Sequence, residues 1–334
     1  MIVSSGLPTC MEGMMYPVPF TTVDDLITIA KHAEQLGYHS VWGNDHMTTQ
    51  HYVREKFNQS PNFWEPLIIY AHLAAHTTNL RFGTGMLVTP MRRDIVVVAK
   101  QVATLDQLSK GRLILGLGVG AYREEFEALH PNWKVHRGDL LEENIQVLRK
   151  LFSEQTITWE GEYYQIKDVN MFPKPSKTLP IYIGGNNPNA IRRASIYGDG
   201  WLPAGMAVEQ AREKIVQFKD MIEKQNRDFE KIDVAMQLVV RVDNNHEQAI
   251  KRFKQSQMYN HLISLSQSTL KDQENSKHVE INLIGNFDEV IEKAKRFEEA
   301  GVKHLCGLYF CAESINELLD QMQVFAEEIV PHIS

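Results

Sequence analysis

The stretch from residue 80 to residue 120 constrains the fold more than any other part of the chain. It holds two short apolar runs, 80–88 and 112–117, with an amphipathic segment, 93–108, between them. A strand, a helix and a second strand of these lengths are about the minimum that a crossover between parallel strands requires. The stretch therefore predicts a βαβ unit.

Both predicted strands of this unit become glycine-rich where they end. The first carries Gly83 and Gly85, and the second ends in Gly116, Gly118 and Gly120. The strands are otherwise almost entirely apolar, as burial on both faces of a parallel sheet requires. Backbone without Cβ atoms lets a flat ligand approach closely, and the active sites of parallel α/β folds lie at the carboxyl ends of strands. We therefore expect a ligand site at this edge.

The rest of the chain repeats the same alternation. Further apolar runs, separated by helical patterns, occupy residues 2–7, 39–42, 179–183, 200–202, 234–242 and 304–309. With the two strands of the central unit they make eight, the number at which a parallel sheet closes into a (β/α)8 TIM barrel. The 334 residues suit one such barrel, and no linker rich in Pro, Ser or Gly divides them. We therefore expect a single α/β barrel domain that spans 1–334.

Three segments lie outside this alternation. Residues 156–167 hold two short strand patterns around Glu160 and Gly161, which predicts a hairpin that decorates the barrel. Residues 256–282 are polar and without periodicity over most of their length, which favours a lid-like loop. The connection 11–20 is rich in methionine and aromatic residues, and it fits either a hydrophobic plug over the core or a wall of the pocket.

Composition and charge narrow the range of functions. Hydrophobic residues make up 43% of the chain and charged residues 23%, as in a globular enzyme, and the net charge of −7 argues against a nucleic-acid-binding surface. The three cysteines lack CxxC spacing, so neither a disulfide framework nor a zinc site is expected. The amino terminus lacks a signal-peptide pattern, and no apolar run approaches the roughly 18 residues of a membrane-spanning helix. These features predict a cytoplasmic enzyme that does not bind membranes.

One pair of histidines raises a metal-binding alternative. His72 and His76 are four residues apart in a helical pattern, which places both on one face. However, Leu73 follows His72 where the metalloprotease motif HExxH has a glutamate. We therefore interpret the pair as helix-surface or core histidines and expect no metal.

Three motifs together resemble a known superfamily. They are GYHSVWGNDHM at 37–47, LRFGTGMLVTPMRRDIVVVAKQVATLDQLSKGRLILGLGVGAYREEF at 80–126, and FPKPSKTLPIYIGGNNPNAIRRA at 172–194 with GDGWLP at 198–203. The chain resembles the bacterial luciferase-like superfamily of flavin- and F420-dependent oxidoreductases over most of residues 1–205, and more weakly beyond. WGNDHM and GVGAYREEF are most similar to its F420-dependent branch. The resemblance implies reduced FMN or coenzyme F420 as the cofactor, a small-molecule substrate, a separate flavin or F420 reductase, and a homodimer.

The resemblance also assigns the central glycines. It places a non-prolyl cis peptide at Gly85–Met86 to support the central ring of the cofactor, and it places Gly118 and Gly120 along the ring and its ribityl chain. The same glycines with Ala121 loosely fit the dinucleotide fingerprint G-x-G-x-x-G/A. That alternative is disfavoured because the glycines follow the fourth strand rather than the first, and no acidic residue ends the next strand.

The best anion site in the sequence is the turn after the fifth strand, Gly184, Gly185, Asn186 and Asn187. Asn187 suits the cap of a helix that starts at Pro188 and offers free N–H groups to a phosphate. The resemblance makes this turn the binding site of the cofactor phosphate, and an ordinary capped helix is the alternative. Arg192 or Arg193 is expected to add positive charge, while the other arginine solvates the helix.

Asp45 and His46 leave the second predicted strand at its carboxyl end. The resemblance places a histidine here beside the cofactor ring, where an imidazole that titrates near neutrality moves a proton or hydrogen-bonds the substrate. His46 is therefore the predicted catalytic residue and Asp45 a predicted cofactor-binding residue, and a surface turn is the alternative. Trp42, Trp64 and Tyr16 fit equally well as pocket wall or as aromatic core.

Two reaction types agree with this predicted site. An enzyme that uses reduced FMN would activate oxygen and insert one atom into a substrate, whereas an F420 enzyme would transfer hydride. A non-catalytic flavin-binding barrel is the alternative, since a fold does not fix a function. A metal-dependent barrel hydrolase would require paired histidines, HxH, at a strand end, and the sequence has none. We therefore predict a luciferase-like oxidoreductase of the monooxygenase type that depends on a flavin or F420.

Overall fold

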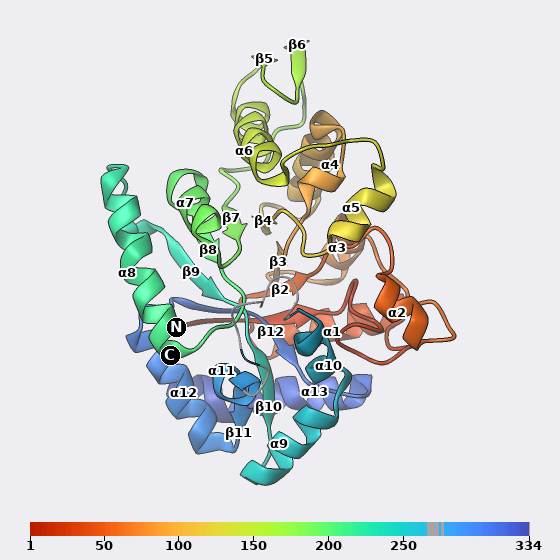
Figure 1. The fold of residues 1–334 in the computed structure, drawn as a ribbon, viewed down its shortest axis with the longest axis vertical. Helices are drawn as coiled ribbons and strands as arrows, with labels where there is room; N and C mark the ends of the chain where they lie inside the picture. Colours follow the sequence, from red (N-terminus) through yellow and green to blue (C-terminus); the bar gives the residue numbers. More distant parts are fainter. Residues whose placement is uncertain (266–273, 275–276, 334) are drawn as a thin grey trace.

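The computed structural model describes residues 1–265, 274 and 277–333. Within these residues eight parallel strands follow one another around a ring, and the last pairs with the first to close it. In ring order they are β1 (Ile2–Leu7), β2 (Ser40–Gly43), β3 (Arg81–Thr84), β4 (Leu113–Leu117), β7 (Ile181–Gly184), β8 (Gly200–Leu202), β9 (Asp233–Met236) and β12 (His304–Phe310). The predicted (β/α)8 TIM barrel is confirmed (Figure 1).

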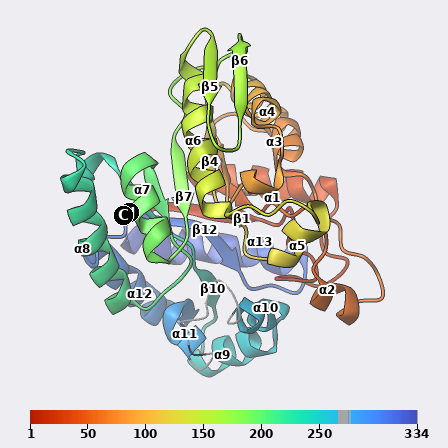
Figure 2. The ribbon, with the colours of Figure 1, turned by 45° about the horizontal axis from the view of Figure 1, so that its top comes forward.

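Helices cover the outside of the barrel (Figures 1 and 2). The longer ones are α1 (Val23–Gln35), α3 (Pro66–His76), α4 (Ile95–Leu108), α6 (Arg137–Ser153), α7 (Pro188–Tyr197), α8 (Val208–Lys224), α9 (His246–Gln255), α12 (Phe287–Glu299) and α13 (Ile315–Val324). The shorter ones are α2 (His51–Lys56), α5 (Arg123–Leu129), α10 (Gln257–Leu265) and α11 (His278–Ile281). The start of α1 is fixed by a capping box in which Thr22 and Asp25 bond each other's backbone N–H groups. None of the described helices is long and apolar enough to cross a lipid bilayer.

The seventh predicted strand, 234–242, is in fact two strands. β9 pairs with the amino-terminal half of β12, whereas β10 (Val239–Val242) pairs with its carboxyl-terminal half and with a strand that was not predicted, β11 (Leu283–Gly285). The break falls at Gln237, whose backbone N–H donates to the Pro203 carbonyl at 3.1 Å. The Gln237 side chain donates to the Tyr309 hydroxyl at 3.0 Å. Gln237 interrupts this mainly apolar run in the sequence, but a single polar residue does not reveal a change of partner strand.

The expectation of a lid-like loop at 256–282 is wrong for the part of this range that the structure describes. Residues 257–265 form α10 and residues 278–281 form α11. Residues 266–273 and 275–276, which were included in that expectation, lie outside the described residues. α10 buries Met258, His261 and Leu262 at helical spacing, and its polar outer face concealed this pattern in the sequence.

The hairpin expected near 156–167 is confirmed. β5 (Ile157–Glu160) and β6 (Gln165–Val169) pair antiparallel and project beyond α6 at one end of the molecule (Figures 1 and 2). The Glu143 carboxylate of α6 accepts from the Trp159 indole at 3.0 Å and from the Tyr164 backbone N–H at 2.9 Å. One side chain therefore ties the hairpin to the barrel layer.

Trp42 fills the interior of the barrel and belongs to the core. Its side chain is fully buried, and its indole N–H donates to the Ser40 hydroxyl at 2.8 Å. A Cβ atom on Gly83 would lie only 2.2 Å from Trp42 Cδ2. The glycine in β3 is therefore required by the close approach of the indole ring.

We expect Gly83→Ala to lower the free energy of unfolding by about 3 kcal/mol, because the added methyl group overpacks a rigid, buried indole. Gly37→Ala is the control, since nothing lies within 4 Å of its Cβ position and only its φ of +77° is unfavourable. That change should cost about 1 kcal/mol. Urea denaturation measures both values, and a loss in Gly83→Ala no larger than in Gly37→Ala would contradict the packing argument.

Candidate active site

A cavity of about 1350 Å³ opens at the carboxyl ends of the barrel strands. This volume exceeds the usual upper range of about 1,000 Å³ for a single small-molecule site, so it suits a cofactor together with a substrate. The residues that the sequence assigned to catalysis or cofactor binding all line it, namely Asp45, His46, Gly85, Met86, Gly118, Gly120, Gly184, Gly185, Asn186 and Asn187. The structure thus brings together four segments that are far apart in the sequence.

The floor of the cavity is built around Met86. The Gly85–Met86 peptide is cis, as the resemblance implied. A Cβ atom on Gly184 would lie 1.4 Å from Met86 Cε, and one on Gly118 would lie 3.1 Å from Met86 Cγ. These two glycines therefore make room first for the methionine side chain, which in turn presents an apolar surface to a ligand.

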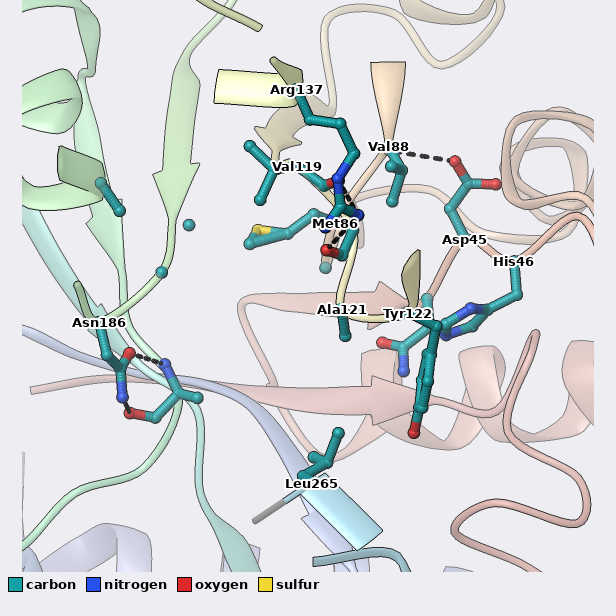
Figure 3. Close-up of a pocket in the computed structure, with 18 of the residues that line it drawn as sticks. Asp45, His46, Met86, Val88, Val119, Ala121, Tyr122, Arg137, Asn186 and Leu265 are labelled. Carbon is teal, nitrogen blue, oxygen red and sulfur yellow. Dashed lines mark hydrogen bonds between the residues drawn. The ribbon is translucent and has the colours of Figure 1, made fainter. Parts of the chain in front are cut away.

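Asp45 holds a loop rather than presenting its carboxylate to the cavity. The fully buried carboxylate accepts from the Val88 backbone N–H and from Arg92 Nη2, both at 2.9 Å, and it points away from the cavity in Figure 3. Burial raises the pKa of Asp45, and the positive charge of Arg92 offsets part of that rise. The predicted cofactor contact is therefore limited to the backbone of Asp45, while its side chain fixes the turn after β3.

His46 is oriented by a carboxylate that the sequence prediction missed. Glu125 of α5 is buried, and one of its oxygens accepts from the backbone N–H groups of Met47 and Thr48. Its other oxygen lies 3.0 Å from His46 Nδ1. The side-chain amide nitrogen of Gln50 lies 3.1 Å from the same Nδ1 atom. A proton on Nδ1 would be donated to the carboxylate, because a carboxylate only accepts hydrogen bonds, and it would leave a lone pair on Nε2 in the neutral ring. The only sequence signal was the pair of glutamates in AYREEF, and nothing in it separates Glu125 from the partly exposed Glu124.

The loop after β7 has two asparagines with different roles. The Asn187 side chain caps α7 by accepting from the Ala190 backbone N–H at 2.9 Å, as predicted. The Asn186 side chain instead makes two hydrogen bonds with the backbone of Ala204, at 2.9 and 3.1 Å (Figure 3). It therefore joins this loop to the one after β8, while the backbone carbonyl of Asn186 accepts from Lys214 Nζ at 3.0 Å.

Arg193, and not Arg192, supplies positive charge to the cavity. Arg192 is exposed and pairs with Glu142. Arg193 is 4% exposed and lines the cavity, and its Nη2 atom lies 3.3 Å from the same Glu142 carboxylate. In the described part of the chain the buried Nε atom of Arg193 has no hydrogen-bond partner. A Cβ atom on Gly138 would lie 2.8 Å from Arg193 Nη2, so the guanidinium lies against the first turn of α6. A buried arginine and the amino termini of α6 and α7 thus lie at the same part of the cavity, where the sequence predicts the anion site.

A second wall contains aromatic and histidine side chains that were not predicted. Tyr122 lies beside His46, with ring centroids 5.9 Å apart (Figure 3). His261 of α10 also lines the cavity, and burial together with the neighbouring His46 lowers its pKa to about 3. By contrast Tyr16 and Trp64 do not line the cavity. Of the methionine-rich connection 11–20, Met15 lines the cavity, whereas Met11 and Met14 are fully buried in the core, so both proposed roles occur in one loop.

The histidine pair on α3 is remote from this site. The rings of His72 and His76 contact each other at 4.8 Å between centroids, and neither residue lines the cavity. Across the described ranges, no three His, Cys, Asp or Glu side chains are arranged to hold a metal ion.

We expect the buried, neutral His261 to make the protein less stable in mild acid. The unfolded histidine binds a proton below pH 6.5, whereas the folded one does so only near pH 3, so unfolding takes up a proton between these values. The contribution of neutral His261 to the free energy of unfolding is thus fully present above pH 6.5. It is lost as the pH falls, by at most about 1.4 kcal/mol per pH unit. Urea denaturation between pH 4 and pH 7 should show a shallower slope for His261→Gln, and equal slopes would contradict the prediction.

Comparisons with known proteins identify the family. The model of the luciferase-like monooxygenase family matches residues 4–304. An F420-dependent glucose-6-phosphate dehydrogenase from Amycolatopsis mediterranei (strain U-32) is 27% identical over 297 residues, which cover 84% of this chain and 87% of that protein.

Two solved structures share the fold. One is an F420-dependent secondary alcohol dehydrogenase in complex with an F420-acetone adduct, with a TM-score of 0.81, 21% identity, and coverage of 100% of this chain and 99% of the other. Monooxygenase RslO1 from Streptomyces bottropensis has a TM-score of 0.80, 20% identity, and coverage of 100% of both chains. Since the family model covers most of the sequence and the barrel agrees with it, the chain belongs to the luciferase-like monooxygenase family.

Proposed function

We propose that the protein is an F420-dependent oxidoreductase that transfers hydride between its deazaflavin cofactor and a small organic substrate. Family membership and the relatives named as F420-dependent dehydrogenases support this proposal. The main structural support is a row of positively charged side chains along one wall of the cavity, which we call the cationic wall. Unlike the names of relatives, this feature belongs to the chain itself. A non-catalytic flavin-binding barrel would leave the pairing of His46 with Glu125 without a purpose.

The cationic wall fits a cofactor with several negative charges. Arg193 has a buried Nε atom without a hydrogen-bond partner among the described residues, although its Nη2 atom pairs with Glu142 at 3.3 Å. Arg137, the first residue of α6, and Lys134 before it continue the lining. Arg123 contributes less, because Glu127 pairs with it at 2.6 Å. FMN ends in a single phosphate, whereas F420 continues beyond its phosphate into a chain of carboxylates. Cations that extend past the anion site therefore favour F420.

The residues of the chain would divide the work around the cofactor. Bound F420 supplies a ring carbon that accepts or donates hydride. His46 Nε2 takes the hydroxyl proton of the substrate as its carbonyl forms, and Glu125 stabilises the imidazolium that results. The apolar side chains of Met15 and Met258 keep water away from this step.

A monooxygenase that uses reduced FMN is the second candidate, and the description of the family favours it. Arg193 and the helix termini beside it suit the single phosphate of FMN as well as that of F420. The F420-dependent enzyme and the FMN-dependent monooxygenase differ in the role of Lys134. It would contact the carboxylate chain of F420, whereas FMN would not reach it. Lys134 is exposed and has no carboxylate partner in the parts of the chain that are described.

The proposal extends to the assembly and setting of the enzyme. Ile68 of α3 and Val97 of α4 are 66% and 51% exposed on neighbouring helices, which supports a homodimer interface there. A separate F420 or flavin reductase regenerates the cofactor, and the enzyme works in the cytoplasm as one barrel domain over 1–334.

We expect Arg193→Gln to weaken binding of both F420 and FMN by about tenfold, because it removes the buried charge at the anion site. Lys134→Glu should weaken F420 binding by about fivefold and leave FMN unchanged. Lys254→Glu, on exposed α9 and outside the cavity, is the matched control and should change neither. Absorbance titration of both cofactors measures these affinities. Tighter binding of FMN than of F420, with no effect of Lys134→Glu, would favour the monooxygenase.

We expect His46→Ala to lower kcat at least about tenfold while the melting temperature changes little, because the imidazole moves a proton at the cavity edge. Glu125→Gln should keep the fold and lower kcat less. Normal turnover in His46→Ala would remove this residue from the mechanism, and normal turnover in Glu125→Gln would reduce Glu125 to a loop anchor.

A further inference from the structure

α10 gives the cavity a wall that lies outside the motifs that identify the family. Its residues 258, 261, 262 and 265 line the cavity and share one helical face. Figure 3 shows Leu265 across the cavity from Arg137 of the cationic wall. The helix is fixed in place because the Gln257 side chain donates to the carbonyls of Gly13 and Met14 at 2.7 and 3.0 Å. This wall is therefore a preformed surface.

His261 is the polar group of this wall. Its Nδ1 atom lies 3.1 Å from the Tyr52 hydroxyl, which lies 3.4 Å from the Tyr122 hydroxyl. No residue in the described part of the chain bonds Nε2, so that nitrogen remains for a ligand. Burial keeps the pKa of His261 low, and the ring is neutral at physiological pH. A neutral imidazole held at Nδ1 offers one hydrogen bond at Nε2.

The side of the cavity around His261 carries no cation among the described residues. The lysine and arginine side chains that line the cavity come from residues 123–137 and from Arg193 on α7. Around His261 the lining is apolar, with Met15, Met258, Leu262 and Leu265. Among the described residues of this wall a phosphate dianion would lose its hydration without gaining an opposite charge, which is strongly unfavourable.

We propose that His261 is a substrate-binding residue and that its wall selects an uncharged, largely apolar molecule with a single hydroxyl or carbonyl oxygen. The inference rests on the proposed function, because it places the substrate between this wall and the proton-accepting His46. Tyr122 contacts the ring of His46 and the hydroxyl of Tyr52, so it connects the two histidines. His261 then hydrogen-bonds the substrate oxygen while His46 exchanges its proton. A sugar phosphate, the substrate in the name of several relatives, is disfavoured at this site.

Calorimetric titration of the F420-loaded protein with octan-2-one and with glucose 6-phosphate tests the proposal. We expect octan-2-one to bind and glucose 6-phosphate to show no saturable binding. His261→Phe should weaken the binding of octan-2-one about tenfold and should raise the Michaelis constant for octan-2-ol equally, with kcat within about threefold, because it removes one hydrogen bond and keeps the ring. His261→Gln, which retains a hydrogen-bonding group, should stay within about threefold of the parent protein.

Further variants separate this inference from the proposed function. Tyr52→Phe removes the hydrogen-bond partner of His261 Nδ1 and should weaken octan-2-one binding about threefold. His76→Phe, at an exposed position of α3, is the control and should change nothing. F420 affinity should be the same in all variants, which also shows that they are folded. Tighter binding of glucose 6-phosphate, or an unchanged affinity for octan-2-one in His261→Phe, would overturn the inference. Failure to bind F420 would overturn the proposed function instead, and the ketone titration of FMN-loaded or cofactor-free protein would still decide the role of His261.

Discussion

The contact between Met86 and the glycines that end β4 and β7 sets the depth of the cavity. Cβ atoms on Gly118 and Gly184 would lie 3.1 and 1.4 Å from this side chain, so only glycine leaves it room. Met86 packs on the buried cluster around Trp42 and closes the interior of the barrel. A ligand must therefore lie above Met86, among the loops at the carboxyl ends of the strands. The polar groups proposed to act on the ligand therefore come from those loops and from the helices beside them, α7 and α10.

The loops place positively charged side chains on one side of the cavity and uncharged side chains on the other. The cavity is therefore electrostatically asymmetric. Arg193 and the amino termini of α6 and α7 place positive charge on one side, where the Nε atom of Arg193 has no hydrogen-bond partner among the described residues. The negative charge of Asp45 does not compete, because Arg92 pairs with it at 2.9 Å outside the cavity. Under the proposed function this asymmetry would orient an anionic cofactor, with its charged part on that side and its ring at the floor near His46.

The fold and the loop positions were predictable from the sequence because their signals are local. Gly118, Gly184 and Asn187 each mark a strand end or a helix start within a few residues, and His46 directly follows a strand. Glu125 and His261 act through contacts with residues 79 and 209 positions away, and no short pattern encodes such distances. The same reason explains the divided strand at 234–242, whose break depends on a hydrogen bond to the loop after β8. Sequence patterns thus located the site, and tertiary contacts determined which side chains act in it.

The two histidines of the cavity, His46 and His261, have different hydrogen-bond partners at Nδ1. We relate their different proposed roles to these partners. The Glu125 carboxylate lies at His46 Nδ1, whereas the phenol of Tyr52 lies at His261 Nδ1. Because the two rings are close enough to repel, a proton on His46 further disfavours one on His261. In the proposed mechanism a proton released by a substrate between the two rings therefore goes to His46, and His261 keeps a neutral hydrogen bond to the substrate oxygen. Two residues of the same type can in this way serve proton transfer and recognition without interchanging.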